Sequence, residues 1–309
     1  MDYDRQNPAF YALLVALIFM AVGPIVLMFS NSFKLDVDII GGTSGLIFLP
    51  TIQNYETALC DVLWYEPKHL DFCALQFGGA FVNSLIIALV STALTLIIGC
   101  MAAYALVRFR FMGRDTASLT TLMVRMVPPA VLLVPVFGLW NNEFCISKKF
   151  WLGELIRDTF GGRGDICLAG THSGIILIYV AMNLPFVIWI LQSFIVQVPR
   201  SLEEAARVDG VGPFQVFFQI VLPLIKPGLA AAAIFTFRIA WNEYLLASAL
   251  SDRDTKTVPI LIVNNMSEFN VEWGVIMATG MLLAIPPIIF TLFASRQIIT
   301  GMTAGAVKG

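Results

Sequence analysis

Long runs of apolar side chains are the feature of this sequence that most restricts its fold. Of its 309 residues, 58% are hydrophobic and 13% are charged. Soluble domains average about 45–50% apolar and about 25% charged residues. The excess lies in six blocks, each near the length of about 20 residues that crosses a hydrocarbon core. The blocks are residues 11–29, 81–107, 117–140, 173–196, 227–250 and 274–295.

Each apolar block is predicted to be an α-helix, because in lipid every backbone N–H and C=O group needs a partner within the protein. The first block, 11–29, is predicted to be a retained span rather than a secretion signal. Its leader carries Asp2 and Asp4 beside a single Arg5, whereas a signal begins with a positive segment. The prediction is an all-α membrane protein with six transmembrane helices in one domain, 1–309.

The distribution of Lys and Arg predicts which side of the membrane each connection faces. Nine of these residues fall in one set of segments, namely 1–10, 108–116, 197–226 and 296–309. Eight fall in a longer set, namely 30–80, 141–172 and 251–273. Because cytoplasmic segments are enriched in basic residues, the first set, with both termini, is predicted to be cytoplasmic. The second set is predicted to form periplasmic loops.

Four of the five cysteines lie in the predicted periplasmic loops. Cys60 and Cys73 fall in the first loop, Cys145 and Cys167 in the second, and Cys100 lies within a span. Disulfides persist in oxidising compartments such as the periplasm. The pairs Cys60–Cys73 and Cys145–Cys167 are therefore predicted, although four cysteines allow three connectivities and free thiols remain the alternative.

The sequence lacks the common local motifs for nucleotide binding, nucleophilic hydrolysis and metal binding. It contains no G-x-x-x-x-G-K-[ST] phosphate loop and no G-x-S-x-G nucleophile turn, which are the local signatures of nucleotide binding and of one class of hydrolases. His69 and His172 lie in loops without Cys or Glu at the spacing of metal ligands. No catalytic residue, metal site or bound cofactor is predicted, which leaves transport, channel or scaffold functions.

The polar segment 197–226 has the pattern of a short helix, a turn and a second helix. Ser201 followed by Glu204 fits a capping box, so a helix is predicted over 202–209. Gly210 suits the left-handed position that ends such a helix. Gly212 and Pro213 then begin a second helix, which runs to Pro223. A rigid helix-turn-helix on the cytoplasmic side is expected.

The spacing within this segment resembles the EAA loop of ATP-binding-cassette importer permeases. The matching positions are Glu204, Ala205, Ala206, Gly210, Ile220, Leu222 and Pro223, with Asp209 beside the glycine. Further segments are similar to the six-span subunit of the maltose-permease-like, carbohydrate-importing branch. They are "PPAVLLVPVFGLW", "MNLPFVIWILQSF", "AWNEYLLASAL" and "GMTAGAVKG". The resemblance covers nearly the whole chain and is weakest over 30–80.

The resemblance implies a mechanism and a set of partners. In this family the EAA helix docks on a cytoplasmic ATPase dimer, which binds ATP and Mg²⁺ and rocks the spans between inward- and outward-facing states. Glu204 would lie at the docking surface, Ala205 and Ala206 would allow close approach, and Gly210 would permit the turn. The implied partners are a homologous permease subunit, the ATPase dimer, a periplasmic substrate-binding protein and the lipid bilayer, without nucleic acid. The implied location is the bacterial inner membrane.

Polar residues within spans are expensive and are candidates for the transport pathway. The candidates are Arg125, Asn183, Arg238, Trp241, Asn242 and Glu243. Related permeases usually carry uncharged residues where Arg125 and Arg238 stand. Either these arginines pair with Glu243 or with an acid on a partner chain, or they admit an anionic sugar derivative, which arginine binds through its bidentate fork. Trp241 would stack on a sugar or anchor the span at the membrane interface.

The predicted function is therefore half of the pathway of a binding-protein-dependent carbohydrate importer. The first alternative is a permease of the same machinery for a non-sugar solute. A second is an ion-coupled secondary transporter, which needs intramembrane acids, and Glu243 is the only acid in the predicted spans. A membrane scaffold would leave the EAA spacing without explanation. The identity of the sugar is not encoded in these motifs.

Overall fold

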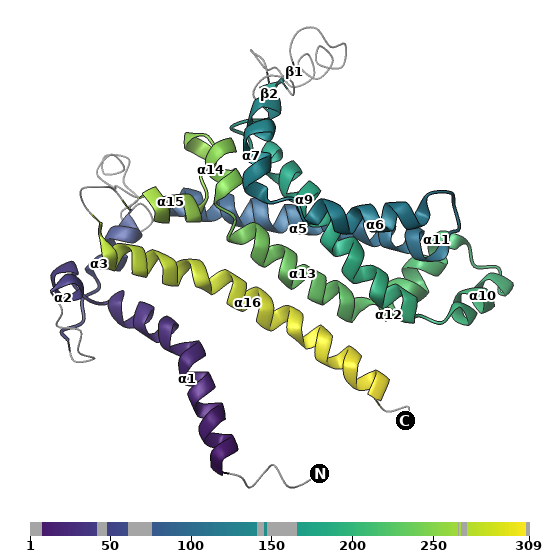
Figure 1. Cartoon of the computed structure of the whole chain (residues 1–309), viewed down its shortest axis with the longest axis horizontal. Coiled ribbons are helices and arrows are strands. Elements are labelled where there is room, and N and C mark those ends of the chain that lie inside the picture. The colour runs from purple at the N-terminus through teal and green to yellow at the C-terminus, as the bar shows by residue number, and fades with distance from the viewer. Residues whose placement is uncertain are drawn as a thin grey trace. The chain divides into compact units, whose positions relative to one another are not determined.

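The computed structural model describes residues 8–41, 48–60, 76–140, 145–146, 166–264, 266 and 271–306 (Figure 1). The chain divides into two compact units. The first unit comprises Met1–Gly78 and Leu261–Ile285, and the second comprises Gly79–Ile260 and Pro286–Gly309. The regular elements among the described residues are helices, apart from one pair of two-residue strands, β1 (Cys145–Ile146) and β2 (Ile166–Cys167).

Four of the six predicted apolar blocks are single long helices in the part of the chain that the structure describes. They are α1 (Pro8–Asn31), α5 (Phe77–Arg108), α9 (His172–Gln197) and α16 (Trp273–Ala306). Each is long and apolar enough to cross a membrane. Pro185 lies inside α9, and Pro286 and Pro287 lie inside α16. Both helices continue through these prolines without a break.

The third block is a bent pair of helices rather than one continuous helix. Residues Arg114–Arg125 form α6, Pro129–Gly138 form α7, and the two are bent by 95°. The cause is local, because a residue before proline avoids the α conformation and proline has no N–H to donate. Pro128 is extended at ψ 137° and Pro129 begins α7. Arg125 therefore ends a helix instead of lying in the middle of one.

The fifth block is also not the single helix predicted over 227–250. It contains α13 (Lys226–Trp241) and α14 (Leu245–Leu250), with a non-helical break at 242–244. Before α13 the chain forms α11 (Pro213–Val216), a π-helical turn η4 (Phe217–Val221) and α12 (Leu222–Leu224). The helical segment Pro213–Leu224 meets α13 at a bend of 74°. The broken backbone is tolerated in lipid only where protein or water satisfies it.

The shorter elements fill the connections between these helices. The first unit adds α2 (Asp36–Ile40) and α3 (Gln53–Ala58), and the second adds α10 (Arg200–Val208) and η5 (Arg253–Thr255). The helix α15 (Val258–Asn264) follows η5. Within the first unit, the buried Asn54 side chain donates to the carbonyl oxygens of Ser32 and Lys34 at 2.9 and 2.7 Å. This amide satisfies backbone groups at the end of α1 that have no helical partner.

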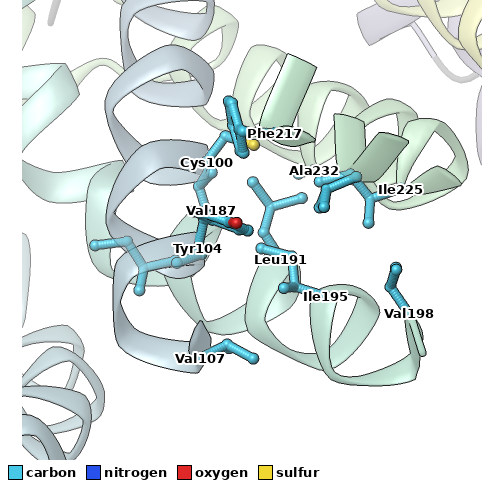
Figure 2. Close-up of a cluster of buried hydrophobic side chains, with 13 residues drawn as sticks. Cys100, Tyr104, Val107, Val187, Leu191, Ile195, Val198, Phe217, Ile225 and Ala232 are labelled. Carbon is cyan, nitrogen blue, oxygen red and sulfur yellow. The ribbon is translucent and has the colours of Figure 1, made fainter. Parts of the chain in front are cut away.

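The core of the second unit joins α5 and α9 to the segment around η4. Figure 2 shows Cys100, Tyr104 and Val107 of α5 and Val187, Leu191 and Ile195 of α9 directed into one cluster with Phe217. Ile225 and Ala232 complete it from the start of α13. Gly99 lets α5 approach α9 closely, because a Cβ there would lie 2.6 Å from Cγ1 of Val187. Small residues commonly mark such helix contacts in membranes.

Substitution Gly99→Ala is expected to lower the thermal stability of the purified assembly, because an added methyl group forces α5 and α9 apart. Overpacking of this kind costs about 1–3 kcal/mol. Thermal melting of the detergent-solubilised protein measures the effect. Gly79→Ala, on the same helix with nothing within 4 Å of its Cβ position, is the matched control. The double variant Gly99→Ala/Val187→Ala should recover part of the loss, and equal melting of Gly99→Ala and Gly79→Ala would contradict the close contact.

Candidate functional site

The helix α10 begins earlier than predicted and has no capping box. Arg200 is its first residue, and Pro199 precedes it with φ −61° and ψ 130° and no side-chain cap. Ser201 therefore lies within the first turn and is exposed. The predicted Ser201–Glu204 capping box is wrong because Pro199 sets the extended conformation that the cap position requires, so the helix starts directly after it.

Gly210 ends α10 as predicted. Its φ is +83°, a conformation that costs glycine nothing and strains other residues. The Gly210 N–H donates to the Arg207 carbonyl at 3.1 Å, and the Val211 N–H donates to the Ala206 carbonyl at 2.9 Å. These two bonds form a Schellman motif and satisfy carbonyls that the helix leaves free. Pro213 then opens α11 at its first turn, as expected.

A buried ion pair fastens α10 to the long helices, and sequence reasoning missed it. Nε of Arg108 donates to Oε1 of Glu203 at 2.5 Å, and the two side chains are 6% and 3% exposed. The Tyr104 hydroxyl donates to the other carboxylate oxygen at 3.0 Å. The only signals in the sequence are an arginine that ends an apolar block and an acid placed one residue before the expected Glu204.

The outward side of α10 carries exposed apolar residues while an acid is turned inward, the reverse of an ordinary surface helix. Glu203 and Ala206 are buried, whereas Leu202 is 45% and Val208 is 86% exposed. Glu204 and Ala205 are exposed as well. The other predicted coupling positions range from exposed to half-buried, namely Asp209, Gly210 and Pro223 (exposed) and Ile220 and Leu222 (half-buried). Ala206 therefore packs inside its own chain and leaves Glu204 and Ala205 on the surface.

Arg125 lies against the first of two aromatic rings in contact, one on α9 and one on α13. Arg125, at the end of α6, places its guanidinium carbon 3.9 Å from the ring centre of Phe186 on α9. Phe186 meets Phe235 of α13 edge-on, with ring centres 5.9 Å apart. Phe235 and Arg238 are three residues apart and share one side of α13. Arg238 therefore lies on the same side of α13 as the ring that contacts Phe186.

Arg238 and Asn242 lie on an exposed side of α13, whereas Trp241 and Asn183 do not. Both Arg238 and Asn242 are exposed, and the Asn242 amide donates to the Arg238 carbonyl at 3.0 Å. The Trp241 ring is 1% exposed and stacks on Phe237 with centres 5.7 Å apart. In this structure Trp241 packs inside the chain, and its expected roles in sugar stacking or interface anchoring stay predictions. Asn183 is buried and donates to the carbonyl of Tyr179 within its own helix at 2.9 Å.

Glu243 serves as a backbone acceptor at the break between α13 and α14. Its carboxylate accepts the N–H groups of Leu246 and Ala247 at 2.8 and 3.0 Å. It also accepts the Tyr179 hydroxyl at 2.7 Å. Among the described residues no ion pair joins Glu243 to Arg125 or Arg238. The expected pairing within this chain is therefore not found, and Glu243 instead satisfies the first N–H groups of α14.

The cysteine predictions are tested only in part. Cys60 is disulfide-bonded, and its partner lies outside the described side chains. Cys145 and Cys167 lie opposite each other in the antiparallel pair β1–β2. Cys73 falls outside the described residues, so the pairings Cys60–Cys73 and Cys145–Cys167 stay predictions.

Asn83, at the start of the second unit, holds three segments together. Its amide nitrogen donates to the carbonyls of Asp254 and Lys256 at 2.9 and 3.0 Å, and its oxygen lies 2.8 Å from Nε2 of His172. His172 is thus a hydrogen-bonded residue at the start of α9. Within the described part of the chain no three His, Cys, Asp or Glu side chains gather as metal ligands.

Comparison with known proteins identifies the family. Residues 95–302 match the family of binding-protein-dependent transport system inner membrane components. The chain belongs to this family. It is 36% identical over 236 residues to the trehalose transport permease SugB of Mycobacterium tuberculosis, covering 75% of this chain and 78% of that one. It is 32% identical to the sulfoquinovosyl glycerol transport permease SmoH of Agrobacterium fabrum, covering 84% and 79%.

A solved structure supports the fold independently. A subunit of a bacterial transporter that imports the acidic polysaccharide alginate superposes with a TM-score of 0.67, covering 96% of this chain and 99% of that one at 21% identity. The resemblance to permease subunits of carbohydrate-importing ATP-binding-cassette transporters is confirmed. This permease is an integral membrane protein of a family whose members are not themselves enzymes.

The substitution Glu243→Ala is expected to lower the stability of the permease by about 1–3 kcal/mol, since it leaves buried donors of α14 and Tyr179 without an acceptor. Tyr179→Phe removes one donor together with its need for a partner and should cost less. Thermal melting of the purified protein compares the variants. Glu243→Gln keeps an acceptor without the charge, and it should preserve uptake. Loss of uptake in Glu243→Gln at unchanged stability would favour an ion-coupling role instead.

Proposed function

We propose that this permease forms half of the translocation pathway of an ATP-driven importer that receives a carbohydrate from a periplasmic binding protein. The observation that carries the proposal is the exposed outward side of α10 with its apolar residues, held on a rigid turn and fixed to the long helices. A helix that only bordered water would bury Leu202 and Val208, whereas α10 exposes both beside Glu204. Its exposed side fits a protein partner, which the EAA positions Glu204 and Ala205 identify as the ATPase subunit.

The other parts of the proposed importer have definite positions relative to the membrane. ATP and Mg²⁺ lie on a separate ATPase dimer, which drives α10 and through it the spans. Both termini and α10 lie in the cytoplasm of a bacterium, and the three long loops face the periplasm. The broken helices α6–α7 and α13–α14 supply the two spans besides α1, α5, α9 and α16. The oxidising periplasm accommodates the disulfides Cys60–Cys73 and Cys145–Cys167. The EAA loop docks on the ATPase through Glu204, Ala205, Asp209 and Gly210. Ile220, Leu222 and Pro223 belong to the second helical segment of the loop.

The second half of the pathway is a homologous permease, as the family resemblance implies. The exposed Arg238 is unsuited to lipid, because a charge in the bilayer is expensive unless it meets protein or water. A paired subunit and a water-filled pathway supply both. A non-sugar solute on the same machinery remains the alternative cargo, whereas ion coupling through Glu243 conflicts with its use as a backbone acceptor.

Substitution Gly210→Val is expected to abolish uptake and Gly210→Asn to retain part of it, because asparagine tolerates positive φ and a β-branched residue does not. The unsubstituted permease should co-purify with its ATPase, and loaded binding protein should stimulate ATP hydrolysis in liposomes. Glu204→Lys should break that association while leaving the permease folded. Normal uptake in both Gly210→Val and Glu204→Lys would rule out the docking role of α10.

An anionic carbohydrate is a second candidate for the cargo, favoured by Arg238. Its guanidinium is exposed on α13 and, among the described residues, takes part in no ion pair. Arg125 lies over the ring of Phe186, which meets Phe235 on the same side of α13 as Arg238. A sulfonated or carboxylated sugar offers the oxygens that an arginine fork binds bidentately. The similarity to SmoH, whose named substrate is a sulfoquinovosyl glycerol, supports this class of cargo.

Substitution Arg238→Gln is expected to reduce uptake of an anionic sugar at least about tenfold and to leave uptake of its neutral parent unchanged. A tenfold reduction corresponds to the loss of about one charge-assisted hydrogen bond. Uptake competition between a neutral sugar and its sulfonated derivative in proteoliposomes measures the preference. Arg238→Lys keeps the charge without the fork and should fall between the two. Equal losses for neutral and anionic sugars would instead assign Arg238 to the contact with the partner subunit.

A further inference from the structure

The ion pair between Arg108 and Glu203 is surrounded by protein, and burial alone does not explain why it is charged. Both side chains are more than nine-tenths buried. Well-packed apolar residues of similar volume commonly give equal or greater stability than a buried pair. The hydrogen bonds of the pair therefore indicate a role other than stability.

Arg108 is the last residue of α5 and binds both the end of α9 and the side of α10. Its Nε donates a hydrogen bond to the Glu203 carboxylate on α10. Nη2 donates to the carbonyl oxygens of Ile195 and Val198 at 3.0 and 2.8 Å. The Ile195 carbonyl also accepts the Val198 N–H at 3.2 Å, so the guanidinium adds to the bonds that end α9. One guanidinium thus fixes the terminus of α9 and the side of α10 together.

Tyr104 and Arg200 add contacts on the same side of α10. The Tyr104 hydroxyl, one turn before Arg108, holds the second oxygen of Glu203 at 3.0 Å. Arg200, the first residue of α10, donates from Nη2 to the Val107 carbonyl at 3.3 Å. The apolar cluster in Figure 2 also joins these elements, but dispersion and hydrophobic contacts have no preferred direction. The planar fork of arginine supplies fixed directions instead.

We propose that Arg108 and Glu203 are positioning residues that make α10 move as one body with the ends of α5 and α9. The inference deepens the proposed function and rests on it. A force applied to the exposed side of α10 then reaches two spans through directed bonds, whereas an apolar contact would let the helix turn or slide. The pair determines how much transport each ATP hydrolysis drives, and the fold survives without it.

The test uses the complete transporter in liposomes and measures sugar imported per ATP hydrolysed. Arg108→Lys keeps the charge but cannot hold α9 and α10 together. Arg108→Met/Glu203→Gln replaces the charges with groups of similar size and leaves Tyr104 an acceptor. Both variants should assemble with the ATPase and hydrolyse ATP. The ratio should fall at least about fivefold, the lower end of a typical coupling free energy between sites.

Arg114→Gln is the matched control, since Arg114 makes an exposed pair with Asp115 at 3.9 Å, and its ratio should equal that of the unsubstituted protein. A normal ratio in the double variant would overturn the proposal. Loss of assembly in both test variants would overturn it too, because the pair would then serve folding. Failure of the unsubstituted permease to associate with an ATPase would instead refute the proposed function.

Discussion

The buried contact between Arg108 and Glu203 is the interaction that fixes α10 against the long helices of the second unit. It brings together the ends of α5 and α9 and the inner side of α10 in one group of hydrogen bonds. Because that inner side carries the acid, the apolar Leu202 and Val208 are left on the outer side. One charge pair thus fixes the helix and also decides which of its residues are exposed.

The breaks in the spans, like this contact, occur where helical hydrogen bonds are lost. At each break a side chain or a proline stabilises the backbone. Pro128 and Pro129 separate α6 from α7, and the Glu243 carboxylate receives the free N–H groups of α14. The breaks place Arg125 at a helix end and leave Asn242 exposed beside the non-helical residues. Polar groups within the apolar blocks are therefore divided between those that hold the backbone and those that face outward.

Membership of the carbohydrate-importing permease family was predictable, because the EAA spacing and the apolar blocks are local patterns. The stop at Gly210 was predictable for the same reason, since only its own conformation is involved. The capping box was wrong because Pro199 competes with Ser201 for the same helix start, and a pattern of residue types does not rank the two. Trp241 and Arg238, three residues apart, could not be separated into buried and exposed without knowing which side of α13 meets Phe81.

The sequence by itself determined the class of protein, the long helices and the glycine turn, since each follows from the chemistry of neighbouring residues along the chain. Tertiary structure alone decided that Glu203 is buried while the adjacent Glu204 is exposed, and that Glu243 holds a backbone rather than an arginine. These choices depend on residues about 60 to 100 positions away. Two adjacent acids on a helix point about 100° apart, and only the packing of α5 and α9 determines which of them meets Arg108.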